Sequence, residues 1–215
     1  MISPYTPVPA RAATPADVDA IVAAMTTAFF DDPMWGPAFP DVDRRAEQAS
    51  ALWRLFVTSS LRFPWMLVTG NVESAALWIP PGGSELTSQE ESGLEEFLVG
   101  ITDRTVADGI LRIFGTLEEA HPREPHFYLS LLATHSDHRG HGFGMGLLTE
   151  NLARIDALGA PAYLESCNPA NNERYASVGF TIRDTITLAS GHVVTTMWRP
   201  AAPPGANAAA RAVAG

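Results

Sequence analysis

The chain has 215 residues, of which 46% are hydrophobic, and a formal net charge of −10 at pH 7. This length suits a single domain with a sizeable core, and the negative charge disfavours a nucleic-acid partner. All 14 basic residues are arginine, which excludes Schiff-base, pyridoxal-phosphate and P-loop chemistry because each needs a lysine amine.

Helical signals dominate the first 120 residues. Thr14 predicts a helix cap, with apolar residues at helical spacing as far as Phe29. A second helix is expected over 41–61, and the apolar runs 65–68 and 75–79 predict a hairpin. The acidic stretch 85–96 is interpreted as the solvated face of a helix. More helix, broken near Gly115, is expected to continue to residue 120.

The second half alternates between strands and helices. The expected elements are a buried strand over 127–133, a helix over 143–158, a strand over 162–165, a short helix over 169–178 and a closing hairpin over 180–188 and 192–198. This order predicts one α/β domain with a mixed sheet over residues 1–200. The alanine- and proline-rich residues 201–215 are expected to form a disordered tail.

A glycine-rich turn, Arg139-Gly140-His141-Gly142-Phe143-Gly144, lies between the buried strand and its helix. Free N–H groups at a helix start, together with the helix dipole, favour a phosphate or pyrophosphate. A plain structural turn stays open as an alternative. A Rossmann fingerprint, with Glu165 as its acidic residue, fits less well because its glycine spacing and downstream βαβ units are missing.

Three separated stretches resemble the GNAT acetyltransferase superfamily. They are the pattern Arg139-x-x-Gly142-x-Gly144, the run from Asn168 through Tyr175 to Gly179-Phe180, and the strand from 124 to 136. The resemblance covers the second half of the chain. It implies an α/β domain whose central, mostly antiparallel sheet is flanked by helices and splayed at an acyl-CoA site.

A narrower resemblance points to the puromycin N-acetyltransferase branch. It rests on the run from His121 to Leu129, Leu164-Glu165-Ser166, residues 28–33 and residues 196–200. Arg174 and the loop from Trp35 to Phe39 depart from that branch. The acceptor of that branch is therefore not assigned to this chain.

The resemblance implies acetyl-CoA as co-substrate and assigns the donor residues. Backbone N–H groups of the turn Arg139, Gly140, His141, Gly142, Phe143 and Gly144 would hold the pyrophosphate. Leu131, Leu132 and Ala133 would pair with the pantetheine arm, and a main-chain N–H would polarise the thioester. Asn168 and Asn171 either bond the pantetheine or serve ordinary turn chemistry.

Proton transfer needs an acid and a base. Tyr175 is the expected general acid, because a phenol stays protonated at neutral pH and can donate to the leaving thiolate. Glu165 is one candidate base, and Asp31, Asp32, His126 or a water chain are the others. Asp31, Asp32 and Trp35 are expected to line the acceptor pocket.

Metal and cysteine chemistry are not expected. His135, His138 and His141 recur every three residues but span a turn, and no CxxC or HExxH pattern supports a metal site. Cys167 is interpreted as a packed thiol. Since it is the single cysteine and no signal peptide is evident, a cytoplasmic protein is expected.

The predicted function is acetyl transfer from acetyl-CoA to the primary amine of a small molecule, an antibiotic or a metabolite. The alternatives are a protein or peptide N-acetyltransferase and a catalytically silent CoA-binding module. The acidic balance favours a cationic acceptor. A homodimer is considered, whereas nucleic acid and membrane partners are not expected.

Overall fold

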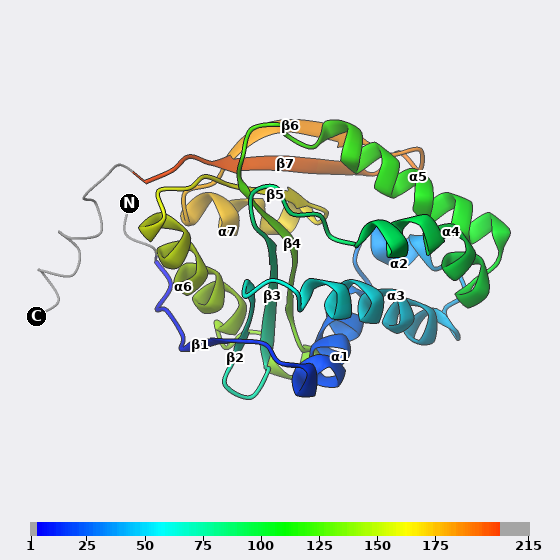
Figure 1. Cartoon of the computed structure of the whole chain (residues 1–215), viewed down its shortest axis with the longest axis horizontal. Coiled ribbons are helices and arrows are strands. Elements are labelled where there is room, and N and C mark those ends of the chain that lie inside the picture. Colours follow the sequence, from blue (N-terminus) through cyan, green and yellow to red (C-terminus); the bar gives the residue numbers. More distant parts are fainter. Residues whose placement is uncertain (1–3, 203–215) are drawn as a thin grey trace, which may run out of the picture.

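The structure, a computed structural model, describes residues 4–202 and contains a seven-stranded sheet in the order β1-β2-β3-β4-β5-β7-β6 (Figure 1). The strands are β1 Ala10–Ala12, β2 Met66–Thr69, β3 Ser74–Ile79, β4 Phe127–Thr134, β5 Ala162–Ser166, β6 Thr181–Thr187 and β7 Val193–Arg199. The tail expected over residues 201–215 lies outside the described residues from 203 onward.

The helices are α1 Val18–Phe29, α2 Trp35–Ala38, α3 Arg45–Ser60, α4 Ser88–Ile101, α5 Arg104–Ala120, α6 Phe143–Ala157 and α7 Asn172–Ser177. Short 3-10 turns lie at η1 Pro15–Asp17, η2 Ser136–His138 and η3 Pro169–Asn171. No helix in the described part of the chain is long and apolar enough to span a membrane.

The sheet is mixed and mostly antiparallel, as predicted. Both predicted hairpins are confirmed as the antiparallel pairs β2–β3 and β6–β7. Among the described strands only β4 and β5 pair in parallel. Parallel neighbours need a crossover connection, and α6 provides it.

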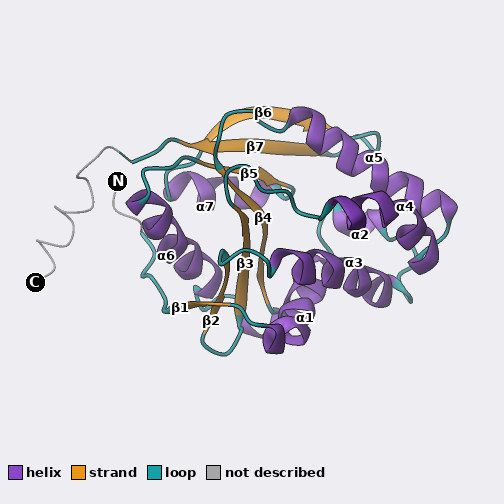
Figure 2. Ribbon diagram, in the orientation of Figure 1, coloured by secondary structure: helices purple, strands orange, loops and turns teal. Residues whose placement is uncertain are grey.

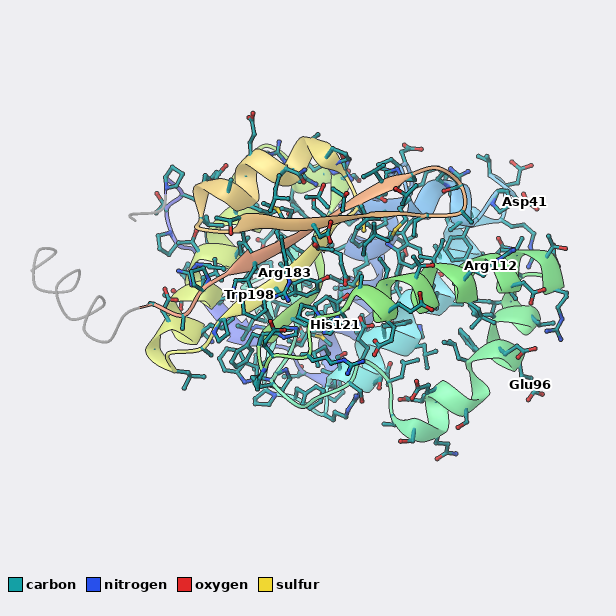
Figure 3. All side chains as sticks on the ribbon, turned by 90° about the horizontal axis from the view of Figure 1, so that it is seen from above. Asp41, Glu96, Arg112, His121, Arg183 and Trp198 are labelled. Carbon is teal, nitrogen blue, oxygen red and sulfur yellow. The ribbon has the colours of Figure 1, made fainter. Side chains whose placement is uncertain are left out.

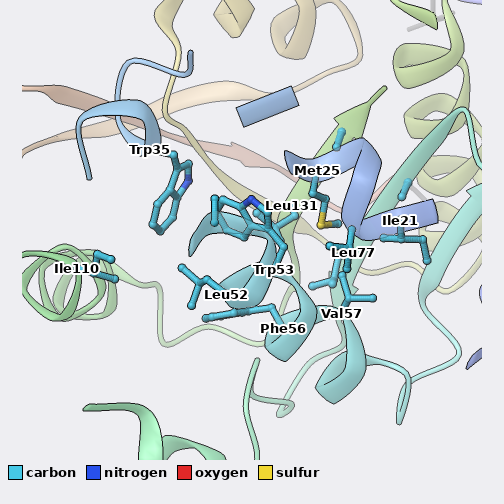
Figure 4. Close-up of a cluster of buried hydrophobic side chains, with 14 of the residues drawn as sticks. Ile21, Met25, Trp35, Leu52, Trp53, Phe56, Val57, Leu77, Ile110 and Leu131 are labelled. Carbon is cyan, nitrogen blue, oxygen red and sulfur yellow. The ribbon is translucent and has the colours of Figure 1, made fainter. Parts of the chain in front are cut away.

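Each face of the sheet carries its own core. Figure 2 shows α6 and α7 on one side of the strands and α1 to α5 on the other. The α6 face buries Leu147, Leu148 and Ile155 against the sheet. The opposite face buries Trp53, shown with its neighbours in Figure 4. The second core continues outward to α5 through Ile110.

One predicted boundary is wrong. The helix break expected near Gly115 lies instead at residues 102–103, and α5 runs through Gly115 without interruption. The Asp103 side chain accepts a hydrogen bond from Val106 N and so caps a new helix. A glycine such as Gly115 lowers the stability of a helix by only about 1 kcal/mol. The helix boundary is therefore set by the Asp103 cap and not by the glycine.

A buried ion pair fastens the last strand to α6. Arg199 Nη2 donates to Asp156 Oδ2 at 2.8 Å, Nη1 donates to Oδ1, and Nε donates to Val178 O at 3.0 Å. The two charged side chains are only 16% and 12% exposed. We expect Arg199→Met to lower the free energy of unfolding by about 3 kcal/mol, because it leaves a carboxylate buried without its partner.

Urea denaturation followed by circular dichroism measures this loss. Arg183→Met is the matched control, since Arg183 pairs with Glu124 in a more exposed site, with 38% and 58% exposure. The control is expected to change the stability by less than about 1 kcal/mol. Equal effects of the two substitutions would contradict the assignment.

Candidate active site

The parallel strands β4 and β5 separate partway along their length. They pair only at Phe127↔Ala162, Tyr128↔Tyr163 and Leu129↔Leu164. Beyond this point β4 continues beside β3, whereas β5 follows β7 as far as Ser166↔Thr195. Residues 131–133 therefore face an opening within the sheet, where an extended group can pair with the backbone as an added strand would.

A β-bulge sits where the strands part. Trp78 pairs with Leu129 and Leu77 pairs with Leu131, so Ser130 is an extra residue in β4. Bulges re-aim side chains and are frequent next to active sites. Here the bulge turns both Ser130 and Leu131 toward the same cavity.

The glycine turn leads from the end of β4 into α6. Gly140 and Gly142 have φ angles of 82° and 79°, a conformation that glycine adopts without strain. Gly142 is the N-cap of α6 and no side chain caps the helix. The first-turn N–H groups have no intrahelical acceptor, and the helix dipole adds positive potential. A Cβ on Gly144 would lie 2.7 Å from Thr134 Oγ1, so the helix start packs directly against the strand.

The side chain of Arg139 holds this turn in place. Its Nη2 donates to Thr27 O at 3.2 Å and to Ala28 O at 2.9 Å, near the C-terminal end of α1. Ser136 N also donates to Thr27 Oγ1, at 3.2 Å. These hydrogen bonds therefore anchor the turn to the C-terminal end of α1. His141 is exposed, and Phe143 is half-buried.

The predicted acid and the two predicted asparagines lie beyond β5. Tyr175, on α7, is half-buried against Phe180 at 6.2 Å between ring centroids. Burial, then the neighbouring Cys167 and Asp32, raise the pKa of Tyr175, so its hydroxyl stays protonated. Asn168 Oδ1 accepts from Ala170 N, and Asn171 Oδ1 accepts from Arg174 Nη1, both contacts within the same turn.

A cavity of about 840 Å³ opens between the sheet and α4 and α5. Its apolar wall includes Trp35, Trp53, Phe56, Leu94, Leu111 and Phe114. Its polar lining includes Glu85, Glu91, Glu95, Glu118, Glu124 and Glu165, with His121, His126 and Arg123. Carboxylates thus outnumber arginines among the described lining residues. Figure 3 shows His121 near the middle of the view from above and Glu96 at the outer edge of α4.

Glu165 is an enclosed carboxylate of this cavity, with a side chain that is 4% exposed. Its Oε2 accepts from the Tyr128 hydroxyl at 2.6 Å. Its Oε1 is buried without a hydrogen-bond partner among the described residues and faces His121 Nδ1 at 3.7 Å. His121 Nε2 in turn lies 3.1 Å from His126 Nε2.

Burial and charge shift several pKa values around Glu165. Burial and Glu165 raise the pKa of Tyr128, which keeps its hydroxyl a donor. Burial raises the pKa of Glu85 to about 7, although the Ser130 hydroxyl donates to it and favours the charged form. Burial, then Asp32 and Glu165, raise the pKa of the Cys167 thiol. A protonated thiol is a poor nucleophile.

Known structures share this architecture, although no family model matches the chain. An acetyltransferase from Corynebacterium glutamicum, described as histone acetyltransferase HPA2 and related acetyltransferase, is 27% identical with a TM-score of 0.69, over 94% of this chain and 99% of that chain. An agmatine N-acetyltransferase mutant is 13% identical with a TM-score of 0.60, over 88% and 97%. A polyamine N-acetyltransferase from Drosophila melanogaster is 14% identical with a TM-score of 0.58, over 89% and 99%.

The chain therefore has the fold of GNAT-type N-acetyltransferases. Such enzymes use acetyl-CoA, and the residues present fit that co-substrate. The turn at Gly142 suits a pyrophosphate, and the opening at residues 131–133 suits an extended arm. Asn172 Nδ2 donates to Thr195 Oγ1 of β7 at 3.1 Å, and Asn172 Oδ1 is buried without a partner among the described residues. No cluster of three or more His, Cys, Asp or Glu residues between 4 and 202 could hold a metal ion.

The residues predicted for the acceptor pocket lie in different places. Trp35 lines the cavity and is 6% exposed. Asp31 is exposed after the end of α1. Asp32 Oδ1 accepts from Met34 N and Trp35 N and so holds the start of α2.

Sequence reasoning missed His121, Glu85, Tyr128 and Ser130 as cavity residues. Glu85 was included in a solvated helix face, but α4 begins only after the Thr87 cap, so Glu85 lies in the preceding loop. That cap, a Thr followed three residues later by Glu90, is a recognisable capping box. It was the signal that could have separated Glu85 from the helix.

Proposed function

We propose that the chain transfers the acetyl group of acetyl-CoA to the primary amine of a small, cationic molecule, an antibiotic or a metabolite. One observation carries the proposal: Leu131 belongs both to the stretch where β4 and β5 part and to the lining of the carboxylate-rich cavity. A donor arm lying between the strands would thus end where an acceptor in the cavity begins.

On the donor side, the N–H groups at Gly142 to Gly144 would hold the pyrophosphate, while Arg139 keeps the turn against α1. The backbone of residues 131–133 would hold the pantetheine arm. The thioester supplies the acyl group. The Tyr175 hydroxyl would protonate the departing thiolate, which is consistent with its raised pKa.

On the acceptor side, the lining carboxylates favour a cation and the aromatic wall favours an apolar body. Solved structures named for agmatine, polyamine and arylalkylamine acetylation share the fold, and we extend amine acylation to this chain. The resemblance of the sequence to the puromycin N-acetyltransferase branch also favours a small-molecule acceptor. Glu165, with one free carboxylate oxygen, would help to remove the proton of the amine.

An amine panel tests the proposal. Thiol release from acetyl-CoA is measured with aliphatic diamines, guanidinium-bearing amines, aromatic amines and peptides with free N-termini. We expect turnover with small cationic amines and the lowest kcat/KM for peptides. Preference for peptides would support a protein acceptor, and binding of acetyl-CoA without release across the panel would support a silent binding module. Either result would contradict the proposal.

Acceptor affinity is expected to depend on the ionisation of Glu85. Because its pKa is raised to about 7, Glu85 is largely neutral at pH 6 and charged at pH 8. A quaternary ammonium ligand keeps its own charge throughout, so we expect it to bind several-fold more tightly at pH 8. Calorimetric titration at both pH values measures the difference. Glu85→Gln is expected to reduce it, and an unchanged pH dependence in that variant would contradict the assignment.

A further inference from the structure

We propose that His121 Nδ1 receives the proton of the acceptor amine, and that His126 is a positioning residue that fixes the tautomer of His121. The inference rests on the proposed function and adds the base that the reaction needs. It is carried by a hydrogen-bond chain that runs from the backbone of Glu124 through His126 to His121, whose Nδ1 faces Glu165 Oε1 at 3.7 Å.

The hydrogen-bond chain starts at the backbone carbonyl of Glu124, which can only accept a hydrogen bond. Glu124 O lies 2.6 Å from His126 Nδ1, so this nitrogen carries a hydrogen and donates it. His126 is 7% exposed, and burial lowers its pKa, which favours the neutral ring. A neutral ring with its hydrogen on Nδ1 has a lone pair on Nε2.

His126 therefore sets the hydrogen position of its neighbour. His121 Nε2 lies 3.1 Å from His126 Nε2 and must donate to its lone pair. The remaining nitrogen of a neutral His121, Nδ1, is left with a lone pair. It faces Glu165 Oε1 at 3.7 Å, an oxygen that receives no hydrogen bond from the described residues.

His121 Nδ1 and Glu165 Oε1 are two acceptors that face each other, so together they can hold one proton. His121 lines the cavity and its side chain is 25% exposed, so an amine in the cavity can reach it. In the step, one N–H bond of the ammonium breaks and its electron pair stays on the nitrogen, while an Nδ1–H bond forms. The resulting imidazolium is opposed by the Glu165 carboxylate, and its proton later passes to water.

The charges around His121 suit this role. Burial lowers the pKa of His121, but the nearby carboxylate of Glu165, followed by the charges of Glu118 and Glu85, outweighs that effect and raises the pKa overall. These groups come from β5, α5 and the loop before α4. The other titratable groups that pack against the His121 ring are His126 and the phenols Tyr128 and Tyr163. The ring centroids of the two tyrosines lie 4.8 and 5.1 Å from that of His121.

The tautomers can be measured without turnover. Nitrogen-15 spectra of the histidine side chains, recorded on the full chain without ligands above the pKa of His121, report which ring nitrogen carries hydrogen. We expect hydrogen on Nδ1 of His126 and on Nε2 of His121. Hydrogen on Nδ1 of neutral His121 would overturn the inference. In His126→Gln, neutral His121 is expected to become a mixture of tautomers, and an unchanged Nε2–H form would overturn the role of His126.

Kinetics test the catalytic part. His121→Gln is expected to lower kcat about 100-fold with little change in the KM for acetyl-CoA. His121→Ala is expected to regain activity when imidazole is added, which a purely structural role would not produce. His126→Gln is expected to lower kcat about tenfold and to shift the acidic limb of the pH–rate profile. A wild-type kcat in His121→Gln, or no rescue of His121→Ala while it remains folded, would overturn the inference. If wild-type protein turns over no amine, the proposed function fails instead.

Discussion

Glu165→Gln is expected to lower kcat with a cationic amine by about 100-fold or more, while the KM for acetyl-CoA stays within about twofold. The substitution keeps the size of the side chain and one acceptor oxygen for Tyr128. It removes the negative charge that faces His121 Nδ1 at 3.7 Å. Without that charge, a cationic imidazole beside it is no longer stabilised, and the amine is deprotonated less readily.

Steady-state kinetics with both substrates varied measure the effect. Glu96→Gln is the matched control, because Glu96 is an exposed carboxylate on the outer side of α4 (Figure 3). It removes the same charge from the chain and is expected to leave kcat unchanged. A kcat for Glu165→Gln within threefold of the wild-type value would rule out Glu165 as part of the proton-accepting pair.

Gly142→Val is expected to weaken acetyl-CoA binding by about 100-fold or more. Gly142 has a φ of 79° and forms the N-cap of α6, and a β-branched residue adopts that conformation only with strain. A side chain here would also stand in front of the N–H groups that would hold the pyrophosphate. Isothermal titration of acetyl-CoA, with free coenzyme A as competitor, measures the loss.

The effect of backbone strain in Gly142→Val must be distinguished from the effect of losing the anion site. Gly159→Val is the control, since Gly159 also has a positive φ, 64°, but follows the other end of α6. Both variants are expected to lose about 1–3 kcal/mol of stability. Only Gly142→Val is expected to lose affinity for acetyl-CoA. Equal affinities for the two variants would show that the turn does not hold the co-substrate.

The elements of the proposed donor half could be predicted from the sequence because they are local. The strand β4, the glycine turn and α6 are consecutive, and glycine spacing reports backbone conformation directly. The parting of β4 from β5 followed from the family resemblance. Its physical cause appears only in the structure: β4 stays paired with β3 on both sides of the bulge at Ser130, while β5 stays paired with β7.

The acceptor half could not be predicted in the same way. His121 and Glu165 are far apart in sequence and meet because α5 ends above the parallel pair β4 and β5. Periodicity reports which face of a helix is apolar but not where the residue after its last turn lies. The sequence predicts Asp31 and Asp32 as acceptor-pocket residues, yet Asp32 uses its carboxylate to accept from Met34 N and Trp35 N.

The central claim is that acetyl transfer occurs between the parted strands and the carboxylate-lined cavity. Its most direct test is a reaction of the full chain with acetyl-CoA labelled isotopically in the acetyl group and a cationic primary amine, followed by mass spectrometry of the amine and of the protein. We predict labelled N-acetylamine and free coenzyme A in equal amounts, with no label on Cys167, at a rate that Glu165→Gln lowers. Coenzyme A release without labelled amine, or transfer that Glu165→Gln leaves unchanged, would contradict the account.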